Sequence, residues 1–133
     1  MEVKMFQLSD PEGVHKPRVK YAHAALIKAG TDILHISGQV GISLEGEIVD
    51  GFSQQCRLAY TNLLAVLKSQ NLGPEHIFKT TLLLTDQGNM EEMFAIQAEM
   101  MGDFCPASTL MVLRSLARPE IQFEVEALAA IPG

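Results

Sequence analysis

The chain has 133 residues, and 10 lysines and arginines against 16 aspartates and glutamates give a formal net charge of -6. This length fits a single domain, residues 1–133, and a composition of 47% hydrophobic and 20% charged residues is typical of globular proteins. The acidic balance argues against a nucleic-acid partner bound through a broad basic surface, and no apolar run is long enough to span a membrane. Two cysteines without disulfide or metal spacing favour a cytoplasmic protein.

The N-terminal part contains two apolar, β-compatible runs, Ala22–Ile27 and Ile33–Val40. The five residues between them, 28–32, include a glycine and predict a hairpin turn. A further short strand is expected near Phe6, and Ile48 and Val49 form a short extended pair after the next turn.

Helical spacing replaces this pattern in the middle of the chain. The apolar positions that predict the first helix are Phe52, Cys56, Ala59, Tyr60, Leu63 and Leu67. This helix should begin near residues 51–53 and stop at Leu72-Gly73-Pro74. For the second helix, Asn89 and Glu92 predict a capping box, and Pro106 predicts its end.

Three further strands are expected at Ile77–Thr85, Thr109–Leu116 and Ile121–Ala130. The element order is then ββ(β)αβαββ, which predicts an α+β fold: a six-stranded mixed sheet with two helices on one face.

Alternation divides the last strand into two faces. One face carries Ile121, Phe123, Val125 and Ala127, and the other carries Gln122, Glu124, Glu126 and Leu128. In Thr109–Leu116 the residues expected to share a side are Leu110, Val112, Arg114 and Leu116. If the helices cover one face, a partly apolar and partly ionisable face stays open, so we expect the protein to oligomerise.

Two features of these strands suggest chemistry. Glu124 and Glu126 are two apart, so their carboxylates share a side, and one could gain a raised pKa and act as a general acid or base. A solvated or salt-bridged strand face is the alternative interpretation. Ser37 and Gly38 lie inside a strand pattern and predict a bulge, either purely structural or with backbone N–H groups free to bind an oxygen.

Other residue types give weaker indications. The four histidines lack metal-ligand spacing, so no metal site is predicted. Arg114 and Arg118 are the positive charges nearest in sequence to the C-terminal carboxylates, and they could serve as interface ion pairs or bind an anion.

Five ordered segments resemble the Rid family, the YjgF-type reactive-intermediate deaminases. They are Tyr21-Ala22-His23-Ala24, Ile36-Ser37-Gly38-Gln39-Val40-Gly41, Lys79-Thr80-Thr81-Leu82-Leu83-Leu84-Thr85-Asp86, Pro106-Ala107-Ser108-Thr109 and Phe123-Glu124-Val125-Glu126-Ala127. The similarity runs from about Pro17 to the end of the chain.

This resemblance implies a chorismate-mutase-like fold, a homotrimer and small-molecule clefts between subunits. It also implies cofactor-free hydrolysis of enamines or imines, such as 2-aminoacrylate, to a keto acid and ammonia. By the same resemblance Glu124 matches the carboxylate that orients water, Tyr21 matches the cleft tyrosine, and Ser37 and Gly38 match the cleft wall.

The chain departs from the family at Ser108, where active deaminases carry an arginine that binds the substrate carboxylate. A simple 2-imino acid is therefore not the expected substrate unless another cation, such as Arg118, takes part. Phe94 stands near where the family often has asparagine, which suggests a more apolar cleft. The alternative function is a trimer that binds or senses a metabolite without turnover. Ribonuclease activity, attached to some relatives, is disfavoured by the net charge.

Overall fold

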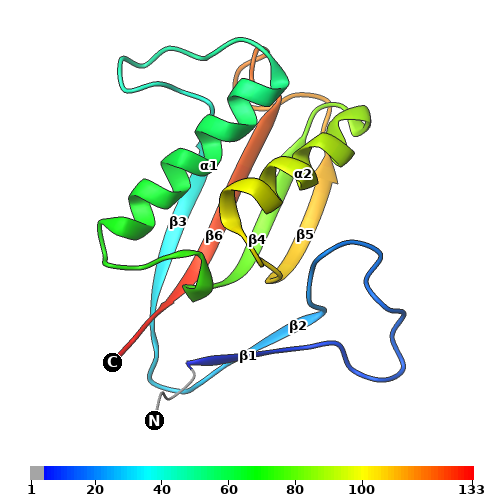
Figure 1. Ribbon diagram of the computed structural model, residues 1–133, viewed down its shortest axis with the longest axis vertical. Helices are drawn as coiled ribbons and strands as arrows, with labels where there is room; N and C mark the ends of the chain where they lie inside the picture. Colours follow the sequence, from blue (N-terminus) through cyan, green and yellow to red (C-terminus); the bar gives the residue numbers. More distant parts are fainter. Residues whose placement is uncertain (1–4) are drawn as a thin grey trace.

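The computed structural model describes residues 5–133, and within this range it has the helices and strands labelled in Figure 1. In chain order the elements are β1 (Phe6–Ser9), β2 (Ala24–Ile27), β3 (Asp32–Val40), α1 (Phe52–Lys68), β4 (Ile77–Leu84), α2 (Met90–Met101), β5 (Ala107–Val112) and β6 (Phe123–Ile131). Two short 3-10 turns, Pro74–His76 and Gln87–Asn89, precede β4 and α2.

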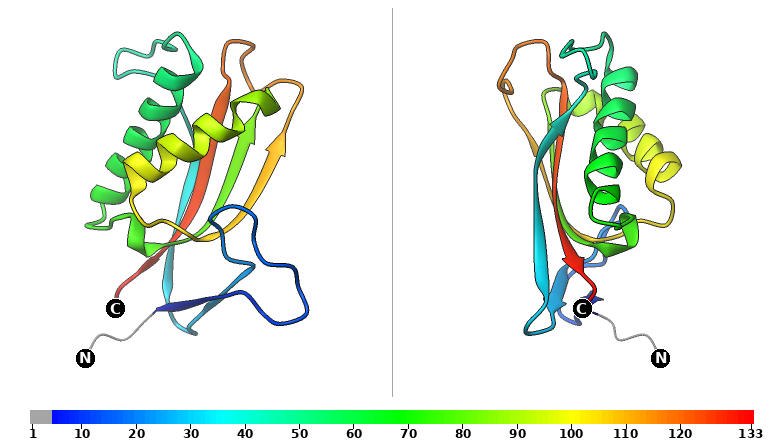
Figure 2. Two further views of the ribbon diagram at one scale, coloured as in Figure 1. Left: turned by 45° about the vertical axis from the view of Figure 1, so that its right-hand side comes forward. Right: turned by 90° about the vertical axis from the view of Figure 1, so that its left-hand side faces the viewer.

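The predicted α+β class is confirmed, with both helices packed on the same face of a mixed sheet (Figure 2). The main sheet has four strands in the order β3-β6-β4-β5, with β4 and β5 parallel and the other pairs antiparallel. β1 and β2 form a separate two-stranded sheet. Between the two sheets, a single bridge joins Ala22 to Ala107, and the Ala22 N–H donates to the Pro106 carbonyl at 3.0 Å.

The prediction of one continuous six-stranded sheet is therefore wrong. β2 pairs with β1 instead of forming a hairpin with β3, so residues 28–32 carry the chain from one sheet to the other. The expected strand at Ile48 is reduced to an isolated bridge with Ile42. The segment near Phe6 supplies the sixth strand because its backbone pairs with β2.

The helical spacing of the first helix correctly predicts its buried face. Cys56, Ala59, Tyr60, Leu63 and Leu67 are all fully buried against the sheet and α2. Burying this stripe is the main source of stability for the helix, because propensity alone is too weak to fix a helix of this length.

Both helix ends differ from the sequence prediction. α1 stops at Lys68, four residues before Leu72, because Asn71 takes a left-handed conformation (φ 59°) that lets the Leu72 N–H return to the Leu67 carbonyl. α2 ends at Met101, with Gly102 (φ 69°) as its C-cap, and not at Pro106. Asn89 makes no side-chain cap, because the turn before α2 is held by Asp86, whose carboxylate accepts from the Gly88 N–H at 2.8 Å.

Alternation in β6 is confirmed. Phe123, Val125 and Ala127 are buried under the helices, whereas Glu124 is half-buried and Glu126 exposed on the opposite, helix-free face. We call this helix-free side of the four-stranded sheet the open face.

The predicted grouping on the preceding strand holds for Leu110 and Val112, which lie two apart within β5, and is wrong for Arg114 and Leu116. β5 ends at Val112, so Arg114 and Leu116 lie in the following loop. Leu110 packs against the core beneath the helices, and Thr109 instead faces Lys79, whose Nζ donates to its hydroxyl at 2.8 Å. The strand is shorter because β4, its partner, ends at Leu84, opposite Val112.

Candidate functional site

A β-bulge in β3 is the first component of the candidate site. The register with β6 runs Ile36 to Ala127 and resumes at Gln39 to Val125, so Ser37 and Gly38 stand opposite the single residue Glu126. The bulge that the glycine predicted is confirmed.

The bulge lies directly against Glu124. A Cβ built on Gly38 would come 1.9 Å from the Glu124 Oε2, so only glycine leaves room for the carboxylate in its present position. Val40 of β3 and Leu83 of β4 are the cross-strand partners of Glu124. The Glu124 carboxylate thus lies between two apolar side chains, Val40 and Leu83, and the bulged backbone at Gly38.

This setting changes the protonation of Glu124. Partial burial raises its pKa above the ordinary value, and the nearby carboxylate of Glu126 raises it further. Both causes disfavour the charged form. A carboxyl group so placed can accept and return a proton closer to neutral pH than a solvated glutamate can.

Tyr21 precedes the residue, Ala22, whose backbone pairs with Ala107, and Ser108 is the next residue of β5. Tyr21 is half-buried with its ring centroid 5.3 Å from that of His23, and the residue after it is joined to the start of β5. The Ser108 hydroxyl accepts from the buried Thr80 hydroxyl at 3.0 Å.

Within one chain, the structure does not bring Ser108 and Glu124 together. Ser108 lies level with Thr80 of β4, which lies level with Ala127 of β6, three residues along the strand from Glu124. Successive strand residues alternate in direction, so Ser108 faces the helices while Glu124 lies on the open face.

The remaining predicted residues lie at the surface. Ser37 is exposed, and its carbonyl accepts from the Gln39 side-chain amide at 3.1 Å. Arg118 is exposed in the loop before β6, where its Nε is 3.7 Å from the Glu120 carboxylate. Its ion-pair partner is therefore Glu120, and within residues 5–133 it forms no ion pair with Glu124.

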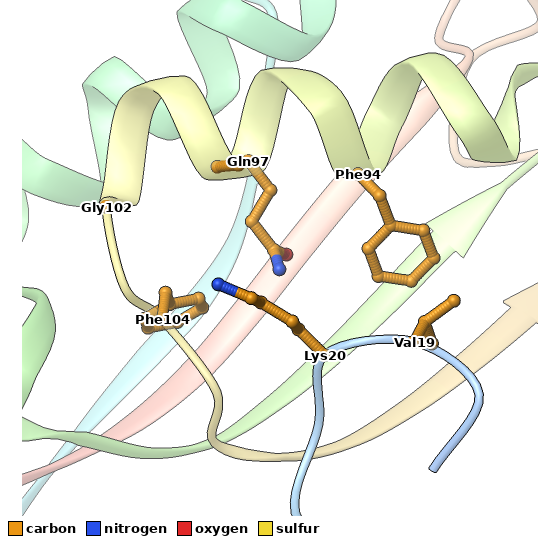
Figure 3. Close-up of a pocket in the computed structure, with 7 residues that line it drawn as sticks. Val19, Lys20, Phe94, Gln97, Gly102 and Phe104 are labelled. Atoms are coloured by element: carbon orange, nitrogen blue, oxygen red, sulfur yellow. The ribbon is translucent and has the colours of Figure 1, made fainter.

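A pocket between α2 and the segment before β2 contains two residues that sequence reasoning missed, Lys20 and Gln97 (Figure 3). Gln97 did give a signal: it is a polar residue at helical spacing from Met90, Met93 and Phe94 on an apolar stripe, and it is 5% exposed. No comparable pattern marked Lys20.

The described residues give two further observations. Across residues 5–133, no three histidine, cysteine, aspartate or glutamate side chains lie close enough together to hold a metal ion. In the same range no helix is both long enough and apolar enough to cross a membrane.

A mixed sheet covered by two helices on one side, with a bulge-held glutamate on the other, places the chain in the Rid/L-PSP class of α+β proteins. The family model described as endoribonuclease L-PSP matches residues 14–131, and the chain belongs to this family. The resemblance to the Rid, YjgF-type proteins is thereby confirmed.

Individual relatives agree with this assignment. RutC family protein YjgH of Escherichia coli (strain K12) is 32% identical over 124 residues, which is 92% of each chain. A RutC family protein of Aquifex aeolicus (strain VF5) is 32% identical over 99 residues, 71% of this chain and 79% of that one. Among solved structures, the Rid-family protein YyfB from Yersinia pestis has a TM-score of 0.84 at 27% identity, covering 96% of this chain and 100% of that one.

Proposed function

We propose that this protein is a cofactor-free hydrolase of small imines, enamines or related carbonyl derivatives, with Glu124 as its catalytic residue. The observation that carries the proposal is the Glu124 carboxylate seated against the Gly38 bulge, half-buried and with a raised pKa. A general base needs this combination of fixed position and a pKa moved toward neutrality.

The proposed hydrolysis consumes one water molecule per imine and needs no other reactant. The Glu124 carboxylate accepts a proton from water as the water oxygen bonds to the imine carbon and the C=N electron pair moves to nitrogen, and the Glu124 carboxyl then returns this proton to the nitrogen. In the resulting carbinolamine Glu124 accepts the hydroxyl proton and passes it to the amine nitrogen as the C–O bond becomes C=O and the C–N bond breaks, so that a carbonyl compound and ammonia leave. An enamine enters the same route after protonation at carbon.

The substrate proposed for the Glu124 site is not a simple 2-imino acid. A substrate carboxylate would need a cation or a bidentate pair of hydrogen-bond donors. Ser108 offers only one hydroxyl, which is already hydrogen-bonded to Thr80. A neutral imine needs no such partner.

A homotrimer is part of the proposal. Ser108 lies on the opposite face of the sheet from Glu124 of the same chain, so a cleft that uses both groups requires a neighbouring subunit. The open face, where Glu124 lies, is the surface that would meet that neighbour.

The direct test is hydrolysis of imines generated in the assay by flavin-dependent oxidation of a primary amine or of an amino acid, with ammonia release as the readout. We expect the unmodified protein to accelerate hydrolysis of the imine that lacks a carboxylate. The Glu124→Gln variant should hydrolyse this imine about 100-fold more slowly or worse, because a positioned general base usually contributes this much to the rate. A Glu124→Gln variant that hydrolyses this imine as fast as the parent would refute the catalytic role.

Two variants sharpen the comparison. Glu126→Gln keeps the proposed base and removes the neighbouring carboxylate that raises its pKa, so we expect activity to persist with its acid limb moved to lower pH. Ser108→Arg should add hydrolysis of the 2-imino acid. If all proteins fold and assemble but neither imine is hydrolysed by any of them, the metabolite-binding alternative is supported instead.

A further inference from the structure

The pocket on the helix side of the sheet has apolar walls and two polar side chains that reach into it. It measures about 170 Å³ and is bounded by the apolar side chains of Val19, Phe94 and Phe104. Lys20 reaches into it from the segment before β2, and Gln97 reaches into it from α2 (Figure 3). The polar side chains of Lys20 and Gln97 therefore meet at this pocket from distant parts of the sequence.

The orientation of the Gln97 amide is fixed by Tyr60. The Tyr60 hydroxyl is fully buried and lies 2.7 Å from the Gln97 Oε1, to which it donates. Burial raises the pKa of Tyr60 well above its ordinary value, so the phenol keeps its proton and requires an acceptor. The amide oxygen is thus engaged, and the amide nitrogen is left to face the pocket.

That nitrogen has no protein acceptor. Within the described part of the chain, Gln97 Nε2 takes part in no hydrogen bond, and no buried side-chain nitrogen or oxygen lacks a partner. The Nε2 is consequently open to the pocket, where its two N–H groups are available to a ligand.

Lys20 supplies a charge at the same place. Its Nζ lies 3.3 Å from the Asp103 carboxylate, but the two side chains are 64% and 96% exposed, so this pair contributes little and can yield to another anion. In Figure 3 the Lys20 side chain runs below the Gln97 amide, and its ammonium ends on the side of the pocket formed by Gly102 and Phe104. Both groups are hydrogen-bond donors, so the space between them calls for an acceptor.

We propose that this pocket binds a small monocarboxylate, held by Lys20 and the Gln97 amide nitrogen, with its hydrocarbon chain against Val19, Phe94 and Phe104. A cavity of about 150 Å³ can hold benzene, so a carboxylic acid of about six non-hydrogen atoms fits the space. One ammonium and one amide match a monoanion, whereas apolar walls offer nothing to the remaining oxygens of a phosphate. Within one chain Glu124 lies on the other face of the sheet, so binding in this pocket and hydrolysis at Glu124 can be measured separately.

The test is a calorimetric titration of the full chain with butyrate, with its neutral analogue butyramide and with inorganic phosphate. We expect saturable butyrate binding with a Kd on the order of 1 mM, because a ligand with so few atoms makes few contacts. Butyramide and phosphate should bind at least about tenfold more weakly. Butyramide or phosphate binding as tight as butyrate would overturn the assignment.

Variants identify the donors. Lys20→Met should weaken butyrate binding about tenfold or more, and Lys28→Met, at an exposed lysine outside the pocket, should leave it unchanged. Gln97→Glu keeps an acceptor for Tyr60 but replaces the amide nitrogen by a carboxylate oxygen, so it should abolish binding. Since Lys20 is exposed, its variant keeps the fold, and unchanged butyrate affinity in Lys20→Met would refute the proposal even if Gln97→Glu does not fold.

Discussion

At the scale of single residues, the surroundings of Glu124 disfavour the charged form of its carboxylate. Its pKa is raised in the folded protein, so the folded state binds more protons than the unfolded state. The stability linked to this group is present at low pH and is lost as pH rises from about 4.5 through the folded-state pKa. We expect Glu124→Gln to match the parent in free energy of unfolding at pH 4 and to exceed it at pH 7, by less than about 1 kcal/mol because the side chain is half-exposed.

Urea denaturation at the two pH values measures this difference directly. Glu120→Gln is the matched control, since its exposed carboxylate pairs with Arg118 outside the bulge. A Glu124→Gln variant less stable than the parent at pH 7 would show that the ionised carboxylate gains more from partners than it loses by burial.

At the scale of elements, Gln55 joins α1 to the segment that leads into β6. Its Nε2 donates to the carbonyls of Val49 (3.1 Å) and Glu120 (2.8 Å), and its Oε1 accepts from the Gln122 N–H at 2.8 Å. Because the side chain is only 2% exposed, Gln55→Leu would leave these backbone groups without partners, at a cost of about 2–4 kcal/mol in the free energy of unfolding. Chemical denaturation should register this loss, and the exposed neighbour variant Gln54→Leu should change stability by less than about 0.5 kcal/mol. Equal stability of the two variants would contradict the joining role.

The elements also separate what the sequence could predict from what it could not. Local periodicity correctly predicted the buried face of α1 and the two faces of β6, and a glycine inside a strand pattern predicted the bulge at Gly38, because each depends on residues close together in the sequence. Which strand pairs with β2 was mispredicted, since a turn at residues 28–32 suits both a hairpin and a passage between sheets. The pocket was missed for a related reason: Lys20 and Gln97 meet only through tertiary packing.

At the scale of the whole molecule, the open face joins apolar and ionisable groups that a monomer would leave in water. It carries Glu124, the half-buried Leu128 and Ile33, which is 40% exposed, while both helices cover only the opposite side. Association that buries this face would stabilise the assembly and would further reduce the access of water to the Glu124 carboxylate.

We therefore expect light scattering to give a mass of about 44 kDa, for three chains of 14.6 kDa. Leu128→Glu should shift the mass toward that of one chain, because it adds a third carboxylate beside Glu124 and Glu126 in a surface that assembly would dehydrate. Ala65→Glu adds the same charge on the exposed side of α1, away from the open face, and should leave the mass unchanged. A trimer that persists in Leu128→Glu but dissociates in Ala65→Glu would place the interface on the helices, and Glu124 would then face solvent rather than a cleft between subunits.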